Sequence, residues 1–361
     1  MSISIDLIAG ARPNFMKVAS ILDALAGKTS IPFRLIHTGQ HFDHNMSGSF
    51  FEQLGIPSPD INFNIGGGTQ AEQAAGIMQA YEQLLESSPS NLCLVVGDVT
   101  STMACSVTAK KMHLKVAHVE AGIRSGDIKM PEEVNRIVTD SITDYFFTTS
   151  ETANSNLRQS GIAEDQIFFV GNTMIDTLLK HRNRFTQPDC WTNLNLSKGN
   201  YLILTLHRPS NVDEGESLVA MLNAIAANSR SLPLVFPVHP RTAKALADCG
   251  HLDPNIHLVE PLPYLEFNYL VENSKAVITD SGGITEETTV MGIPCLTLRE
   301  TTERPETITM GTNVLVGTSP SAIERELTLL FEGKWKPHSI PPLWDGKAGN
   351  RIVDALLHLD F

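Results

Sequence analysis

Features that would assign a function at a glance are missing from this chain of 361 residues. No apolar stretch approaches the length of a membrane span, and there is no repeat, low-complexity segment or long run of charge. The first residues, MSISIDLIAGARP, lack the basic region of a secretory signal, so we expect them to form a first strand. The five cysteines show no CxxC spacing, and their odd number favours reduced thiols and a cytoplasmic location.

Positive charge is also scarce. Lys and Arg number 27 against 40 Asp and Glu, which gives a formal net charge of −13. This balance argues against nonspecific binding to nucleic acid or to an anionic membrane. An anionic small ligand is not excluded, because a local cluster of basic side chains can invert the sign of the field.

What the chain does contain is a regular alternation of short apolar runs and helix-period segments. LCLVVGD precedes STMACSVTAKKM, for example, and KVAHVEAG precedes PEEVNRIVTDSI. This βαβα order predicts parallel sheets covered by helices on both faces. One helix start is marked by Thr69 and Glu72, which fit a capping box.

A polar stretch at 182–200 interrupts the alternation and is the best candidate for a linker. A second series of apolar runs starts with YLILTLH. Because 361 residues exceed one ordinary core, we predict two Rossmann-like, doubly wound α/β domains, over 1–180 and 200–345. Polar motifs such as GDVTST, HVEAG, LHRPSN and DSGGITEE follow strands in both series. Ligands of such sheets bind beyond the carboxyl ends of strands, so we expect the site in the cleft between the domains.

The segment ITDSGGITEE reads as an apolar strand, a Ser-Gly-Gly turn and a helix-period run. The N–H groups of Gly282 and Gly283 would point at an anion, and Ser281 can add a hydroxyl donor. Glu286 and Glu287 follow one turn later, where a carboxylate suits a ribose diol and would repel a phosphate. The combination favours a nucleotide, although the Ser-Gly-Gly part alone equally fits a plain strand-to-helix turn.

Basic side chains accompany other strand ends. Arg12, and Lys17 one turn into the next helix, could present positive charge to a diphosphate. Arg304 lies in RETTERPE, where a balanced exposed charge cluster is the alternative. In the charged stretch VEAGIRSGDIKMPEEVNR, Arg124 and Asp127 could pair and hold the loop.

Together these motifs resemble those of the non-hydrolysing UDP-N-acetylglucosamine 2-epimerases. The resemblance covers nearly the whole chain in collinear order and includes GARPNFMK, TGQH, GDVTST, HVEAGIRSGD with PEEVNR, LHRPSN, PVHPRT, PLPYLEF, TDSGGITEE and RETTERPE. It implies a glycosyltransferase-B-like fold, usually as a homodimer, in which a C-terminal helix at about 346–361 joins the first domain. It also implies a UDP-sugar substrate, with no metal or redox cofactor.

The resemblance also implies roles for individual residues. The catalytic groups would be Asp98, Glu120, Glu132 and His207. Substrate would be bound by Arg12, Lys17, Arg136, His239, Phe267, Ser281, Gly282, Gly283, Glu287 and Arg304. Gln40 would lie near a second, activating sugar-nucleotide site.

The implied reaction inverts C2 of the sugar by expelling UDP from C1 and adding it back to a 2-acetamidoglucal. Proton transfer on two faces of one carbon suits more than one carboxylate. Glu132 also follows Pro131 in a first helical turn, where the helix dipole alone would favour it. The alternatives are a hydrolysing 2-epimerase that releases UDP and N-acetylmannosamine, a glycosyltransferase, and a catalytically silent sugar-nucleotide sensor. The substituents at C3 and C6 of the sugar are left open.

Overall fold

The structure is a computed structural model that describes residues 4–28, 31–39, 51–206, 215–238, 243, 246 and 251–359, without the side chains of Arg12 and 215–217. The chain forms two compact units. Unit 1 comprises Met1–Lys180 with Pro342–Phe361, and unit 2 comprises His181–Pro341.

Unit 1 is built on a seven-stranded parallel sheet in the order β3-β2-β1-β4-β5-β6-β7. Its strands are β1 (Ile5–Ala9), β2 (Phe33–His37), β3 (Ile61–Asn62), β4 (Leu92–Val96), β5 (Lys115–Val119), β6 (Tyr145–Thr148) and β7 (Ile167–Phe169). The order reverses at β1, which pairs with both β2 and β4. In a doubly wound sheet this reversal marks where ligands bind, beyond the carboxyl ends of the strands.

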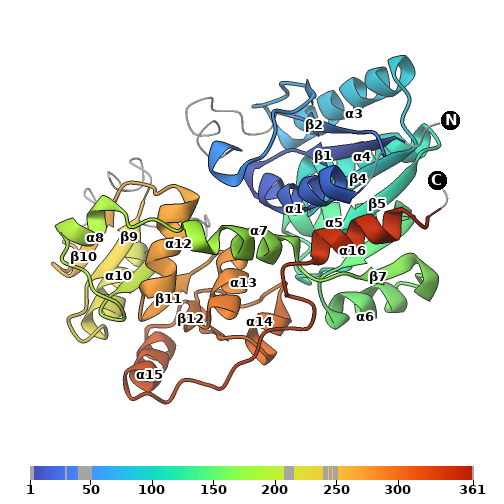
Figure 1. The fold of residues 1–361 in the computed structure, drawn as a ribbon. Helices are drawn as coiled ribbons and strands as arrows, with labels where there is room; N and C mark the ends of the chain where they lie inside the picture. The colour runs from blue at the N-terminus through green and yellow to red at the C-terminus, as the bar shows by residue number, and fades with distance from the viewer. Residues whose placement is uncertain are drawn as a thin grey trace. The chain divides into compact units, whose positions relative to one another are not determined.

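The helices of unit 1 follow the strands in the predicted order. Those whose bounds are described are α1 (Arg12–Lys28), α3 (Gln70–Ser87), α4 (Thr100–Lys111), α5 (Pro131–Ile142), α6 (Glu151–Gln159), α7 (Thr173–His181) and α16 (Ala348–Leu356), with a 3₁₀ turn η1 (Glu164–Gln166). The capping box at α3 is confirmed, because Thr69 accepts from the Glu72 N–H and the Glu72 side chain accepts from the Thr69 N–H. The C-terminal helix α16 packs against α1 (Figure 1).

Hydrogen bonds attach the C-terminal segment, which follows unit 2 in the sequence, to the rest of unit 1. The indole of Trp344, 2% exposed, donates to the Thr149 carbonyl oxygen at 3.0 Å. Asp176 on α7 accepts the N–H groups of Ala348 and Gly349 at 3.1 and 2.7 Å, which satisfies donors at the start of α16. These contacts join residues far apart in the sequence into one unit.

Unit 2 repeats the architecture with a six-stranded parallel sheet in the order β10-β9-β8-β11-β12-β13. The strands are β8 (Leu202–Thr205), β9 (Leu234–Pro237), β10 (Ile256–Val259), β11 (Ala276–Thr279), β12 (Cys295–Thr297) and β13 (Asn313–Leu315). The described helices are α8 (Asp189–Asn193), α10 (Gly215–Ala227), α12 (Tyr264–Asn273), α13 (Gly282–Met291), α14 (Pro305–Thr309) and α15 (Pro320–Phe331), with a 3₁₀ turn η2 (Arg182–Arg184). Here the order reverses at β8, next to β11.

The stretch 182–200, which the sequence suggested as a linker, is folded into unit 2. It contains η2 and α8, and Trp191 and Leu196 pack in a core cluster with Tyr201. The linker interpretation was wrong because these few apolar side chains are enough to anchor an otherwise polar segment.

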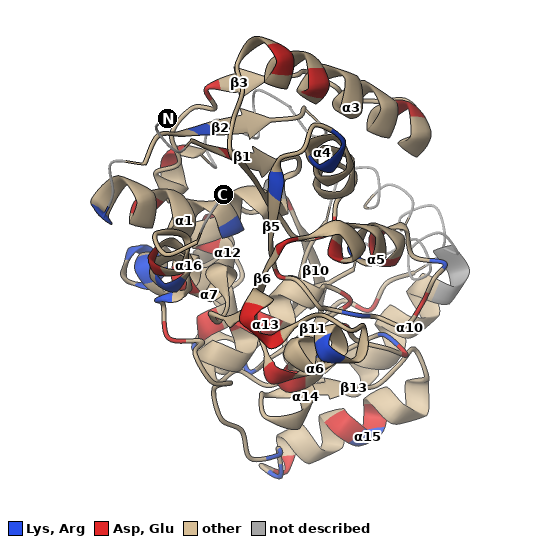
Figure 2. Cartoon of the chain, turned by 90° about the vertical axis from the view of Figure 1, so that its right-hand side faces the viewer, with Lys and Arg blue, Asp and Glu red and all other residues tan. Residues whose placement is uncertain are grey.

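Helix α3 is one place where the acidic composition is concentrated. Figure 2 shows acidic residues along α3, which carries no Lys or Arg. Among the described residues, no helix is both long and apolar enough to cross a membrane.

Candidate functional site

Two of the predicted carboxylates meet at one edge of the unit 1 sheet. Asp98 follows β4 after Gly97, and Glu120 follows β5 directly. The two strands are paired, with Val96 opposite Val119, so their carboxyl ends lie together. Glu132 lies in the first turn of α5 and is exposed.

Glu120 is held by Lys17 in a buried ion pair. Lys17 reaches from α1 to place Nζ 2.7 Å from Glu120 Oε2, and the two side chains are only 9% and 2% exposed. Glu120 has a φ of 69°, a left-handed conformation that L-residues adopt at a cost. Its N–H donates to the Phe147 carbonyl oxygen at 2.9 Å, which holds this turn against β6.

A glycine gives the Lys17–Glu120 pair room. Gly97 has a φ of 70°, and a Cβ on it would lie 3.1 Å from Lys17 Nζ and 3.3 Å from Asn14 Nδ2. The Asn14 side chain in turn donates to the Val96 carbonyl oxygen and accepts from the N–H of Ala11. The residue before Asp98 therefore leaves room for a cation at the end of β4.

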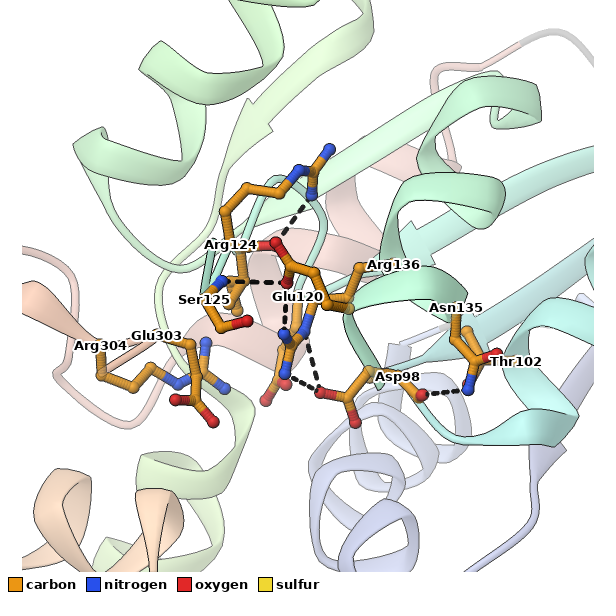
Figure 3. Close-up of polar contacts among 12 residues, drawn as sticks. Asp98, Thr102, Glu120, Arg124, Ser125, Asn135, Arg136, Glu303 and Arg304 are labelled. Carbon is orange, nitrogen blue, oxygen red and sulfur yellow. Dashed lines mark hydrogen bonds and ion pairs between the residues drawn. The ribbon is translucent and has the colours of Figure 1, made fainter. Parts of the chain in front are cut away.

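Asp98 is held by Arg136 from α5. The guanidinium places Nε and Nη2 at 3.0 and 2.6 Å from Asp98 Oδ2 (Figure 3). The Asp98 carbonyl oxygen accepts from Asn135 Nδ2 at 2.9 Å. The Asp98 side chain keeps 28% of its surface exposed, whereas that of Arg136 keeps 4%. Asp98 is thus held by α5, while part of its side chain remains accessible to solvent.

Arg136 also binds Glu133, which follows the predicted Glu132 in the sequence. Glu133 Oε2 lies 2.7 Å from Arg136 Nη1. Its carboxylate also accepts the N–H groups of Ser125 and Gly126, in the loop before α5. Burial raises the pKa of Glu133, but these three donors outweigh that effect and hold the pKa below its ordinary value.

A second buried carboxylate, Asp140, holds the other end of this loop. It accepts from the Gly122 N–H at 3.1 Å and from Arg124 Nη1 at 2.6 Å. The predicted pairing of Arg124 with Asp127 is wrong, because Asp127 instead accepts the N–H of Lys129 within its own turn. Burial raises the pKa of Asp140, but His118 and Arg124 more than offset this, so its pKa is lowered.

His118 connects Asp140 to the turn that carries Asp98. Its Nδ1 lies 2.7 Å from Asp140 Oδ1, and its Nε2 lies 2.8 Å from the Gly97 carbonyl oxygen. Sequence reasoning overlooked Glu133, Asp140 and this use of His118. A signal was present, because Glu133, Arg136 and Asp140 are spaced i, i+3 and i+7 along one face of α5.

In unit 2 the Ser-Gly-Gly segment starts a helix as predicted. Ser281 is the N-cap of α13, and within the described chain its side chain makes no capping hydrogen bond. Gly282 and Gly283 form the first turn, beyond the carboxyl end of β11. Near the position that a Cβ on Gly282 would take lie Glu303 Oε1 at 3.7 Å and the Arg299 guanidinium at 4.0 Å, and these two side chains form an ion pair. N–H groups, a helix dipole and a guanidinium paired with a carboxylate therefore occur together.

The two glutamates of α13 have different partners. Glu287 is buried and accepts from the Tyr264 hydroxyl at 2.8 Å, and burial raises its pKa to about 7. Glu286 is ion-paired with Arg304, whose Nε lies 2.7 Å from Glu286 Oε1. Phe267, on the same helix as Tyr264, is partly buried against a core cluster. Arg304 is thus part of a buried pair, and not of the exposed charge cluster that was the alternative.

Some predicted residues lie outside the described part of the chain. These are Gln40, His207 and His239, together with the side chain of Arg12. Among the described residues, no group of three or more His, Cys, Asp or Glu side chains could hold a metal ion.

Comparisons with known proteins agree with this architecture. A family model described as UDP-N-acetylglucosamine 2-epimerase matches residues 23–357. The UDP-N-acetylglucosamine 2-epimerase of Methanocaldococcus jannaschii is 38% identical over 366 residues, covering 98% of this chain and 99% of that relative. The UDP-2,3-diacetamido-2,3-dideoxy-D-glucuronate 2-epimerase of Pseudomonas aeruginosa is also 38% identical, over 358 residues, with 98% and 99% coverage.

Solved structures match over the same extent. The M. jannaschii UDP-GlcNAc 2-epimerase in complex with UDP-GlcNAc and UDP has a TM-score of 0.88 at 38% identity, covering 99% of this chain and all of that one (100%). The UDP-GlcNAc 2-epimerase of Neisseria meningitidis bound to UDP-GlcNAc has a TM-score of 0.87 at 28% identity, with 99% and 100% coverage. The predicted α/β fold with two doubly wound, glycosyltransferase-B-like sheets is confirmed. This chain belongs to the UDP-N-acetylglucosamine 2-epimerase family.

Proposed function

We propose that this protein catalyses the reversible epimerisation of UDP-N-acetylglucosamine to UDP-N-acetylmannosamine. The observation that carries the proposal is the convergence of Asp98 and Glu120 at the carboxyl edge of the unit 1 sheet, each beside a buried cation. Family membership supplies the reaction class. The exposed Glu132 adds a third carboxylate at the start of α5.

The proposed reaction has two balanced halves. In the first, a carboxylate removes the proton from C2 while the C1–O bond breaks and its electron pair leaves with UDP. The C1–C2 double bond of 2-acetamidoglucal forms. In the second, UDP adds back to C1 and a proton returns to C2 from the opposite face. The sum involves no net oxidation or reduction, so the proposal calls for no redox cofactor.

The residues of unit 1 would act as proton donors and acceptors. Lys17 holds Glu120 and Arg136 holds Asp98, so each carboxylate has a fixed place when the sugar arrives. Glu132 has the freedom of an exposed side chain in a first turn. Placing acid and base on both sides of C2 contributes typically about 100- to 10,000-fold to the rate of such a step.

The residues of unit 2 would hold UDP. The N–H groups of Gly282 and Gly283 and the Ser281 hydroxyl suit the diphosphate, whereas the Ser281 N–H already donates to Thr279 Oγ1. Glu287 suits the ribose hydroxyls. Phe267 would pack on the uracil. Arg12, His207, His239 and Arg304 belong to the proposed binding and leaving-group contacts, and Gln40 to a proposed activating site. A homodimer and a cytoplasmic location complete the proposal, the latter supported by the free thiols of Cys93, Cys105, Cys190 and Cys295.

The test is exchange at C2 in heavy water. The wild-type protein is incubated with UDP-N-acetylglucosamine, and NMR follows deuterium at C2 and the appearance of the manno epimer. Glu120→Gln and Glu132→Gln should lower exchange by about 100- to 10,000-fold. UDP affinity, measured by calorimetry, should persist in both variants because unit 2 holds the nucleotide.

The matched control is Glu151→Gln. Glu151 is also an exposed first-turn glutamate of unit 1, but it is ion-paired with Arg158 on its own helix. Its loss should leave exchange unchanged. Wild-type exchange in both Glu120→Gln and Glu132→Gln would contradict the proposal. Accumulation of UDP with free N-acetylmannosamine would indicate the hydrolysing reaction, and no exchange at all would indicate a sensor.

A second substrate has a specific observation in its favour. The diacetamido-glucuronate 2-epimerase of P. aeruginosa is as similar to this chain, at 38% identity, as the M. jannaschii enzyme. Both substrates share UDP and the 2-acetamido group and differ at C3 and C6 of the sugar. Comparing kcat/KM for the two UDP-sugars decides between them, since the larger value identifies the substrate that the transition state fits.

A further inference from the structure

Glu133 differs sharply from its neighbour Glu132, although both lie in the first turn of α5. Glu132 is exposed, whereas the Glu133 side chain is only 3% exposed. The Glu133 carboxylate accepts from the Ser125 N–H at 2.9 Å, the Gly126 N–H at 3.1 Å and Arg136 Nη1 at 2.7 Å. One buried group thus ties the loop before α5 to the guanidinium of Arg136.

Arg136 connects Glu133 to Asp98 through hydrogen bonds to both carboxylates. Its planar guanidinium offers donors in a fixed fork, so binding one edge restricts the direction of the others. Nη1 is directed at Glu133, and Nε and Nη2 are both directed at Asp98 Oδ2. With Glu133 in place, Arg136 cannot turn without losing a charge-assisted hydrogen bond in a buried setting.

We propose that Glu133 is a positioning residue for the epimerisation, acting on Asp98 through Arg136. It sets the orientation of the guanidinium, and the guanidinium sets the place of the Asp98 carboxylate relative to Glu120. The inference rests on the proposed function, because it assumes that Asp98 takes part in proton transfer. A reaction that moves protons at C2 depends on sub-ångström placement of the carboxylates, and a misplacement of about 1 Å can cost about 100-fold.

Two substitutions separate charge from position. Glu133→Gln keeps the size but places an NH₂ group against backbone or guanidinium donors. Glu133→Asp keeps the charge but withdraws the carboxylate by one methylene, so it cannot reach the loop and Arg136 together. We expect Glu133→Gln to lower kcat by about 10- to 100-fold. Glu133→Asp should lower it by at least about fivefold. The affinity for UDP should not change in either variant.

A double-mutant cycle with Arg136→Gln tests the route. If Glu133 acts through Arg136, adding Glu133→Gln to Arg136→Gln should cost less than about threefold more in kcat. If the role of Glu133 is purely structural, Glu133→Gln should lower kcat by the same factor in the Arg136→Gln variant as in the wild type. Asp144→Asn is the control, because Asp144 also accepts three N–H donors in unit 1, one from the backbone and two from lysine side chains, but at the amino end of β6. It should lower the melting temperature without lowering kcat.

The outcomes are distinct. If both Glu133→Gln and Glu133→Asp fold and keep kcat within about twofold of wild type, the inference is overturned while the proposed function stands. Full additivity with Arg136→Gln would overturn it as well. If Glu133→Gln does not fold, Glu133→Asp and its own cycle with Arg136→Gln decide. If the wild-type protein shows no exchange at C2, the proposed function and this inference fail together.

Discussion

Replacing Lys17 by methionine would remove the cation from a buried ion pair and leave Glu120 behind. The two side chains are 9% and 2% exposed, and Nζ lies 2.7 Å from Oε2. Breaking a buried pair from one side costs about 3–5 kcal/mol, because the carboxylate that stays buried loses a close opposite charge and does not regain its hydration. We therefore expect Lys17→Met to lower the free energy of unfolding of unit 1 by about that amount.

The same helix provides the control. Lys28 on α1 also binds a carboxylate, with Nζ 2.8 Å from Asp354 Oδ1, but these side chains are 35% and 59% exposed. Lys28→Met should cost about 0–1 kcal/mol, because water screens the pair. For a domain of this size, about 3 kcal/mol corresponds to a melting temperature lower by about 6–12 °C. The control should shift it by less than about 4 °C.

Differential scanning calorimetry of both variants measures this contrast, and Lys17→Met combined with Glu120→Gln completes a cycle. The double variant should recover part of the lost stability, because a neutral amide is cheaper to bury than a carboxylate that no longer has the Lys17 charge beside it. Equal melting temperatures for Lys17→Met and Lys28→Met would refute the reasoning that burial, rather than distance, decides the strength of this pair.

Two further predictions follow from backbone and burial. Gly97→Ala should destabilise unit 1 by about 1–2 kcal/mol, because an L-residue is strained at a φ of 70° and its Cβ would press on Lys17 Nζ. Urea unfolding measures the loss of stability, and an unchanged unfolding midpoint would contradict the prediction. Burial raises the pKa of Glu287 from 4.5 to about 7, so the folded state holds a proton that the unfolded state has released between these values. The free energy of unfolding should therefore fall as pH rises through that window, and the fall should be smaller in Glu287→Gln. Melting temperatures of both proteins across this pH range measure the effect. A difference between them that stays constant with pH would contradict the prediction.

The sequence alone was sufficient to predict the sheets and to place the motifs GDVTST, HVEAG and DSGGITEE at the ends of their strands. Apolar runs of strand length alternate with helix-period segments, and chirality leaves few topologies for such a chain. The Thr69–Glu72 capping box was predictable for the same reason, because its residues are three apart and its hydrogen bonds are local. Asp98 and Glu120 were predictable as neighbours because they end adjacent parallel strands.

The partners of these carboxylates were decided by the tertiary structure. Lys17 and Glu120 are 103 positions apart, and Arg136 and Asp98 are 38 apart, so no local pattern specifies either pair. The same limit explains the wrong pairing of Arg124 with Asp127, which was inferred from nearness in sequence. Whether Glu132 or Glu133 is buried depends on the face that α5 turns inward, because adjacent helical residues point about 100° apart. Packing of α5 against the sheet settles that rotation, and with it which glutamate meets solvent and which one holds Arg136.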